Sequence, residues 1–180
     1  MHKIFFKKYY FIDQFIKSNI DKQNKNTTII YRNYTKNYKI DEIILLRNYC
    51  REKRLKFILS NNIKLSVKLK LDGAYIPSFN KNFSHLSYKL KKNFILIGSA
   101  HSLKEIRIKE KQNIKEIFIS SIFKKNKNYL GIYKFNLLSN YSLKKVIALG
   151  GVSDVNIKLL SLTKSIGFAG ISFFNQKKGP

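Results

Sequence analysis

Apolar residues are gathered in eight short runs along the chain, and most of these runs are separated by polar segments with helical spacing. The runs cover residues 9–12, 27–31, 55–59, 71–76, 94–97, 115–123, 146–149 and 167–174. They are nearly continuous rather than alternating, which is typical of parallel strands that are buried on both faces. Strand–helix alternation in eight units predicts an α/β fold, a (β/α)8 TIM barrel, because the alternative doubly wound sheet needs fewer strands.

The segments between the runs predict the helices. Residues 41–53 have acids at the start, bases at the end and apolar residues at helical intervals. Ser102 and Glu105 form a capping-box pattern, and Asp154 is expected to cap a helix over residues 154–164. Shorter helices are expected at residues 63–70, 83–90 and 136–142. The first crossover is expected to be reduced and the eighth helix truncated, since little helical sequence is available for either.

Length and composition suit one barrel domain over residues 1–180, with 44% apolar residues. No apolar run approaches the roughly 18 residues of a membrane span. Residues 1–12 are expected to form the first strand rather than a signal peptide. Cys50 is the single cysteine, so it forms no internal disulfide, and we expect it on a buried helix face of a cytoplasmic protein.

A formal net charge of +26 raises the question of nucleic-acid binding. Most of the basic residues are lysines spread along the whole chain, and Asn and Ile are abundant too. Lys, Asn and Ile share A/T-rich codons, so a biased genome explains this composition better than a selected nucleic-acid ligand. The aromatic residues lie mainly within the apolar runs instead of among clustered bases, which also disfavours that ligand.

The candidate chemistry lies at the carboxyl ends of the predicted strands, where a TIM barrel carries its active site. Gly150-Gly151 follows a buried strand and precedes a helix start, a pattern that lets backbone N–H groups approach a phosphate. The other residues at these ends are Asp13, Arg32, Asn61, Asn62, Ser78, Asn80, Ser99, His101, Ser121, Lys125, Lys127 and Asn175. Acids are scarce among them, so a metal held by paired carboxylates is hard to build. His101 is either a general base or a packed histidine at a helix start.

Four segments in the second half of the chain resemble the thiamine phosphate synthase/TenI family in order and approximate spacing. They are GSAHSLKEI (98–106), SSIF with its polar loop and YLGIYKF (120–135), VIALGGVS (146–153) and GFAGISFF (167–174). Upstream, YYFID, IIYRN, FILSNN and LDGAYI occupy the places of the first four strands more loosely. The chain looks like a divergent, shortened member. The resemblance implies a barrel in thiamine biosynthesis whose synthase, a magnesium-dependent transferase, joins hydroxymethylpyrimidine diphosphate to thiazole phosphate and releases pyrophosphate.

The resemblance also implies roles for residues at matching positions. Arg32 looks like the arginine on the diphosphate, Asn61 the asparagine on the pyrimidine side, and Ser99 a substrate-contacting serine. Gly150 and Gly151 match the glycines near the thiazole phosphate. The expected substrate-binding set is completed by Asn62, Lys125 and Lys127, and the phosphate-binding set by Asn175, which stands where the family has a serine at the end of strand eight.

Departures from the family pattern keep more than one function open. Asn62 and Asn80 stand where the family has magnesium-binding aspartates, so we expect no metal ligands there. Ser121 replaces the histidine of the TenI branch. The chain is therefore either a synthase of phosphorylated substrates or a catalytically degenerate member that binds a phosphorylated ligand or regulates a partner; a basic nucleic-acid binder is the least favoured.

Overall fold

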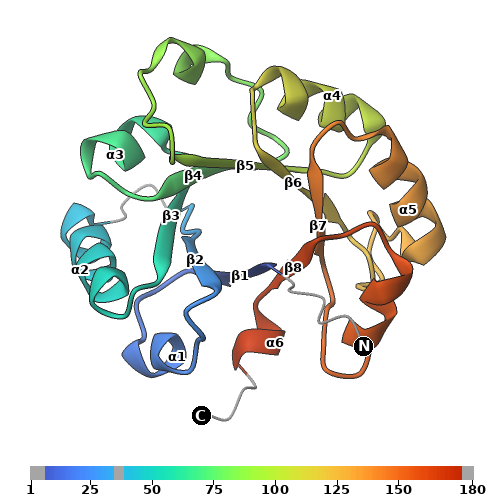
Figure 1. Ribbon diagram of the computed structural model, residues 1–180, viewed down its shortest axis with the longest axis horizontal. Coiled ribbons are helices and arrows are strands. Elements are labelled where there is room, and N and C mark those ends of the chain that lie inside the picture. Colours follow the sequence, from blue (N-terminus) through green and yellow to red (C-terminus); the bar gives the residue numbers. More distant parts are fainter. Residues whose placement is uncertain (1–6, 35–38, 176–180) are drawn as a thin grey trace.

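Eight parallel strands close into a barrel in which the order around the ring is the order along the chain (Figure 1). The computed structural model describes residues 7–34 and 39–175. Residues 1–6, which were expected to belong to the first strand, lie outside this description. The strands are β1 (Lys7–Ile12), β2 (Thr27–Tyr31), β3 (Lys56–Ser60), β4 (Gly73–Ile76), β5 (Ile95–Ala100), β6 (Glu116–Ser120), β7 (Lys145–Leu149) and β8 (Gly167–Gly170). β8 pairs with β1, which confirms the predicted (β/α)8 fold.

Helical segments follow the strands and cover the outside of the ring (Figure 1). They are α1 (Lys17–Asp21), α2 (Ile40–Glu52), α3 (Ile63–Lys68), α4 (Leu103–Lys111), α5 (Gly131–Tyr141), α6 (Ser172–Asn175) and the 3-10 helices η1 (Ser84–Ser87) and η2 (Ile157–Leu162). The reduced first crossover is confirmed, because α1 has only 5 residues. In the described part of the chain the eighth helix is likewise short, with 4 residues in α6. None of the described helices is long and apolar enough to cross a membrane.

Two predicted α-helices are wrong in type. Residues 83–90 contain only η1, because Asn80 and Asn82 side chains accept backbone N–H groups two residues further on and hold this segment in turns. Residues 154–164 contain η2, which begins after Asn156, so Asp154 does not cap it. The helix expected at residues 136–142 is longer than predicted and begins at Gly131.

The strand side chains alternate between the inside of the barrel and the surrounding helices. The inside cluster contains Tyr9, Phe11, Ile30, Ile58, Tyr75, Ile97, Phe118, Ile147 and Ala169. The Phe118 ring lies 5.1 to 5.8 Å from the rings of three of these residues, so aromatic packing fills the middle of the barrel. Ligands therefore have access only at the two ends, which we call the mouth (carboxyl ends of the strands) and the floor (amino ends).

Strand β5 continues through Gly98 and Ser99 to Ala100, beyond the predicted run over residues 94–97. Gly98 pairs with Ile117 in β6, and a side chain on Gly98 would come within 2.8 Å of Cδ of Lys109. The glycine is thus needed for the close passage of a buried lysine of α4, and it is not a strand breaker here. Strand β8 is shorter than expected, because residues 172–175 turn into α6 and pack Phe173 and Phe174 on Phe168.

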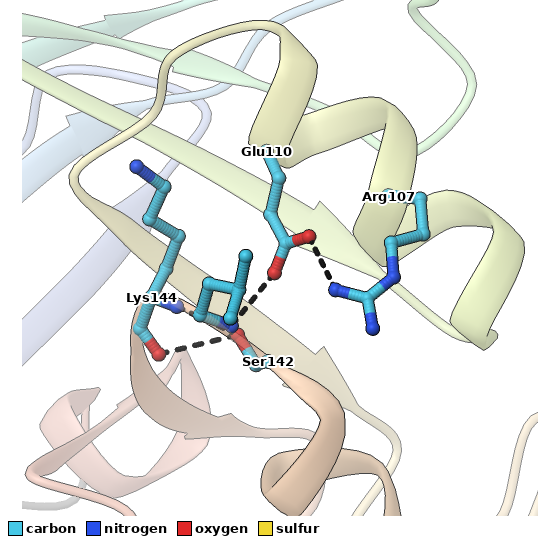
Figure 2. A network of polar contacts seen from close by, with 5 residues as sticks. Arg107, Glu110, Ser142 and Lys144 are labelled. Atoms are coloured by element: carbon cyan, nitrogen blue, oxygen red, sulfur yellow. Dashed lines mark hydrogen bonds and ion pairs between the residues drawn. The ribbon is translucent and has the colours of Figure 1, made fainter.

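A polar network ties α4 to the turn between α5 and β7 (Figure 2). The Glu110 carboxylate accepts from the Arg107 guanidinium at 2.7 Å and from the Leu143 backbone N–H at 2.7 Å. The Ser142 hydroxyl closes the same turn by bonding the backbone of Lys144.

Cys50 lies on the inner face of α2 as expected, and its burial raises the pKa of the thiol to about 12.

Candidate functional site

Arg32 lies at the mouth, immediately after β2, and its side chain is held over an aromatic ring. Its Cζ atom is 4.7 Å from the centroid of the Phe11 ring, a cation–π contact that orients the guanidinium. A pocket of about 270 Å³ opens beside it, lined by Phe11, Ile12, Asp13, Arg32, Tyr34 and Ile171. The arrangement offers an anion a charged planar donor above an apolar base.

Tyr34 belongs to the same pocket, although the sequence analysis did not single it out. Its hydroxyl accepts a hydrogen bond from Ser60 Oγ at 3.2 Å, and its ring lies edge-on to Phe79 at 5.6 Å. Burial raises the pKa of Tyr34, so the phenol stays protonated at neutral pH. Its position two residues after Arg32, at a strand end, was the signal available in the sequence.

The structure brings Asn61 and Asn80 together. The Asn80 Nδ2 atom donates to Asn61 Oδ1 at 2.6 Å, and both residues line a second pocket of about 180 Å³ with Asn62. Asn62 has a structural task as well, because its Oδ1 atom accepts from the Leu65 N–H at 3.0 Å and caps α3. These asparagines therefore place amide donors and acceptors at one side of the mouth.

A buried lysine fixes the loop that carries Asn80. The Lys109 ammonium donates to the Asn80 carbonyl at 2.6 Å and to Gln112 Oε1 at 2.9 Å. Gln112 donates to the same Asn80 carbonyl at 3.1 Å and to the Asn82 carbonyl at 2.8 Å. Burial lowers the pKa of Lys109 to about 8, and Glu105 partly offsets this effect. Sequence reasoning missed this contact, because the helix and loop are joined only in the folded chain.

The side-chain oxygens of Asn61, Asn62 and Asn80 do not fit a magnesium ion held by the protein. The Oδ1 atom of Asn80 accepts the Asn82 N–H at 2.8 Å, and the Oδ1 atoms of Asn61 and Asn62 accept protein donors as well. Magnesium prefers charged carboxylate oxygens in an octahedral shell, which neutral and already bonded amides do not supply. Across residues 7–34 and 39–175, no three His, Cys, Asp or Glu side chains gather closely enough to hold a metal. We assign no metal ligand among these three asparagines.

Ser99 lies near the end of β5, and His101 follows the last residue of that strand at the mouth. Ser99 is buried and accepts a hydrogen bond from the Tyr75 hydroxyl at 2.7 Å. The half-buried His101 places Nδ1 at 2.9 Å from the Ser120 carbonyl and at 3.0 Å from Ser120 Oγ. The Ser102 cap is present too, because Ser102 Oγ accepts the Glu105 N–H, while the Glu105 side chain accepts the N–H of His101, one residue before the cap.

The Gly150-Gly151 turn packs against the loop that follows β6. Both glycines have positive φ angles, 101° and 77°, and the Gly150 carbonyl accepts the N–H groups of Phe123 and Lys124 at 2.9 and 3.1 Å. A side chain on Gly150 would lie 2.4 Å from Ser121 Oγ. This contact brings the exposed loop with Lys125 and Lys127 to the glycine turn. The predicted lysines and glycines therefore share one side of the mouth.

Asn156 is a further residue that the sequence analysis missed. Its side chain accepts the Ser153 N–H at 2.9 Å and donates to the Gly151 carbonyl at 2.8 Å. Two hydrogen bonds from one amide brace the backbone that leaves the glycine turn. Asp154, the expected cap, is exposed and precedes this brace.

Asn175 is placed away from the strand end at which the sequence analysis put it. β8 ends at Gly170, and Asn175 is the last residue of α6. Its Oδ1 atom accepts a hydrogen bond from the hydroxyl of Tyr10, a residue of the outer core. Ser172 follows the strand more closely than Asn175 does, and the phosphate-binding role of Asn175 stays a prediction.

The mouth geometry can be compared with known families. A family described as thiamine monophosphate synthase matches residues 14–174. The chain belongs to this family. Thiamine-phosphate synthase of Hydrogenobaculum sp. is 22% identical over 171 residues, which cover 91% of this chain and 80% of that protein. Thiamine-phosphate synthase of Haemophilus influenzae (strain PittEE) is 31% identical over 123 residues, which cover 63% of this chain and 54% of that protein. The chain thus aligns with little more than half the length of some of these curated relatives.

Solved structures agree with this family in fold. Thiamine phosphate pyrophosphorylase from Pyrococcus furiosus has a TM-score of 0.76 and 20% identity, and the match covers 92% of this chain and 85% of that chain. FabK from Thermotoga maritima has a TM-score of 0.69 at 13% identity, covering 94% of this chain and 58% of that chain. Similarity at these identities shows the barrel fold alone.

Proposed function

We propose that this family member is a thiamine phosphate synthase, which couples hydroxymethylpyrimidine diphosphate with thiazole phosphate to give thiamine phosphate and pyrophosphate. The observation that carries the proposal is that the Arg32 pocket and the Gly150-Gly151 turn lie at the same open end of a barrel whose residues 14–174 match the family. Two phosphorylated substrates need two anion-binding places on the same side, and the Arg32 pocket and the glycine turn are our candidates for them.

The first half of the reaction is the departure of the diphosphate. The bond between the pyrimidine methylene carbon and the diphosphate oxygen breaks, the electron pair leaves with the oxygen, and negative charge grows on the leaving group. Arg32, oriented by the Phe11 ring, donates to this charge, and Lys125 and Lys127 add positive potential from the loop after β6, across the mouth from β2. Fixed donors that stabilise developing charge are the main source of rate in such a dissociative substitution.

The second half is bond formation between the methylene carbon and the thiazole nitrogen. We assign the thiazole phosphate to the backbone of Gly150 and Gly151, which carry no side chains of their own. Asn61 and Asn62 offer amide groups to the pyrimidine, and Ser99, bonded to Tyr75, offers a hydroxyl from below. The residues thus bind and align two substrates, and the phosphorylated small molecules are the partners of the protein.

The proposal extends to the unit and its place in the cell. We propose that residues 1–180 act as one barrel domain, supported by the single ring formed by β1 to β8. We propose a cytoplasmic location, supported by a lone cysteine, Cys50, which is buried as a free thiol.

The decisive experiment measures thiamine phosphate formation by the purified full chain with both substrates, with and without magnesium. We expect product in at least one of the two conditions. We expect Arg32→Gln to lower kcat/KM by about 10- to 100-fold, which is the effect of losing one charge-assisted hydrogen bond. Arg54→Gln is the matched control, because Arg54 is an exposed arginine at the end of α2, away from the mouth, and it should keep wild-type turnover.

Absence of product in both conditions would refute the proposal. Calorimetric binding of thiazole phosphate by the same inactive protein would then support the degenerate family member that keeps its ligand. Equal losses in Arg32→Gln and Arg54→Gln would show that general positive charge, and not the guanidinium over Phe11, assists the diphosphate.

A further inference from the structure

The floor of the barrel carries a pocket of about 500 Å³, larger than either mouth pocket described above. Five lysines and one glutamate give it its charge: Lys7, Lys8, Lys25, Lys56, Lys115 and Glu116. They come from four separate parts of the chain, which meet because the amino ends of parallel strands lie at the same end of a barrel. The proposed reaction uses none of these residues.

The pocket exists because the innermost layer at the floor is charged where barrels usually pack apolar side chains. Lys7, Lys56 and Glu116 lie two residues before Tyr9, Ile58 and Phe118, which belong to the inside cluster. Residues two apart on a strand share a face, so these three positions point into the barrel. Gly73 and Gly167 occupy the corresponding positions of β4 and β8 and contribute no side chain.

The glutamate of the floor pocket is already neutralised. The buried Glu116 carboxylate accepts from the Lys7 ammonium and from the Tyr9 hydroxyl. Burial, with the charge of Glu116, raises the pKa of Tyr9, so the phenol remains a donor to this carboxylate. The charges of Lys7 and Glu116 therefore cancel. The pocket is left with a net positive charge from Lys8, Lys25, Lys56 and Lys115.

The remaining lysines are available to a ligand. Within residues 7–34 and 39–175, no carboxylate pairs with the ammonium groups of Lys8, Lys25 or Lys56, and Lys115 donates only to the neutral Lys92 carbonyl at 3.0 Å. Four like charges around one concave volume repel each other and are stabilised by a compact anion of several charges. Phosphate chains match this requirement, because each phosphate adds charge and acceptor oxygens in a small volume.

We propose that the floor pocket is a second ligand site, separate from the mouth, that binds a phosphate-chain anion such as tripolyphosphate or the triphosphate of a nucleotide. The two sources share the phosphate chain and differ in the nucleoside. The site lies at the end of the barrel opposite to Arg32, so its occupancy does not depend on the proposed synthase reaction.

The test is calorimetric titration of the full-length protein with tripolyphosphate and with ATP. The floor variant Lys25→Gln/Lys56→Gln removes two pocket lysines, both exposed at the start of or before a strand. The control variant Lys68→Gln/Lys134→Gln removes two exposed helix lysines that lie outside the pocket and lowers the net charge equally. We expect the floor variant to weaken tripolyphosphate binding by about tenfold or more and the control by about twofold at most.

Three comparisons decide the outcome. Equal weakening in the floor and control variants would overturn the proposal, because general charge would then explain the binding. Loss of all tripolyphosphate binding in Arg32→Gln would overturn it too, because the anion would then sit at the mouth. Unchanged floor binding in Arg32→Gln supports a separate site whether or not the protein makes thiamine phosphate. Tighter binding of ATP than of tripolyphosphate would identify a nucleotide as the source, and the reverse an inorganic chain.

Discussion

Replacing Gly150 by alanine tests whether the glycine turn is required by the fold before any ligand is bound. The residue has a φ angle of 101°, which disfavours an L side chain by about 1–2 kcal/mol or more. Its new Cβ atom would lie 2.4 Å from Oγ, 2.9 Å from Cβ and 3.0 Å from Cα of Ser121. Overpacking of this kind costs about 1–3 kcal/mol.

The two costs add, and the reduced freedom of the unfolded chain offsets about 0.4–1 kcal/mol of them. We therefore expect Gly150→Ala to lower the free energy of unfolding by about 1–4.5 kcal/mol. The assay is urea unfolding followed by circular dichroism, with the midpoint and slope compared between variants. Gly170→Ala is the matched control, because a Cβ atom there meets nothing within 4 Å, and it should change the free energy of unfolding by no more than about 0.5 kcal/mol.

Adding Ser121→Ala separates the two causes. It removes the Oγ atom that the new side chain meets first, so the double variant should be less destabilised than the sum of the single variants, by about 0.5–3 kcal/mol. The positive φ angle would remain, so stability should return only in part. A Gly150→Ala protein as stable as Gly170→Ala would refute the reasoning, because the loop after β6 could not then pack against this turn.

Two further predictions concern α4. Lys109→Met should flatten the pH dependence of the free energy of unfolding. In the wild type the folded-state pKa of Lys109, about 8, lies below the unfolded value of about 10.4. In the pH range between these two values the unfolded chain binds more protons than the folded chain, so wild-type stability rises with pH. Between pH 7.5 and 9.5 the wild type should gain about 2 kcal/mol more than Lys109→Met in urea unfolding, whereas the exposed Lys104→Met should behave as wild type. Ser102→Ala should lower the unfolding free energy by about 1 kcal/mol in the same assay, because the Glu105 N–H loses its acceptor.

Each α4 prediction has a result that contradicts it. Parallel pH profiles of the wild type and Lys109→Met would mean that the ammonium is not desolvated beneath the Asn80 loop. An unchanged urea midpoint in Ser102→Ala would mean that solvent replaces the cap without cost.

Local sequence patterns determined those strands and helices whose formation depends on residues close together in the chain. The strand at residues 27–31 was predicted with the bounds that the structure has, because a short apolar run between polar segments is recognisable without its partners. The helix at residues 41–53 and the Ser102 cap are of the same kind, since helical spacing and capping act within a few residues. Eight such units sufficed for the barrel, because short right-handed crossovers leave few arrangements for parallel strands.

The sequence predicted only those residues of the candidate site that directly follow a predicted strand. Arg32 and Gly150-Gly151 stand directly after buried runs, so the rule for barrel active sites selects them from the sequence. The rule says nothing about side-chain partners, and Asn175 shows the consequence: its oxygen is bound by Tyr10, 165 positions away.

Tertiary structure decided the contacts between residues distant in the chain. The sequence contains no sign that Lys109 reaches the Asn80 carbonyl, or that Ser121 occupies the space beside Gly150, because each depends on how a loop packs on another unit. The floor pocket is the same case: its lysines are scattered over more than a hundred residues, and only the closure of the ring gathers them around one volume. Local patterning specifies which segments become strands and helices, whereas closure of the barrel specifies which side chains meet at its two ends.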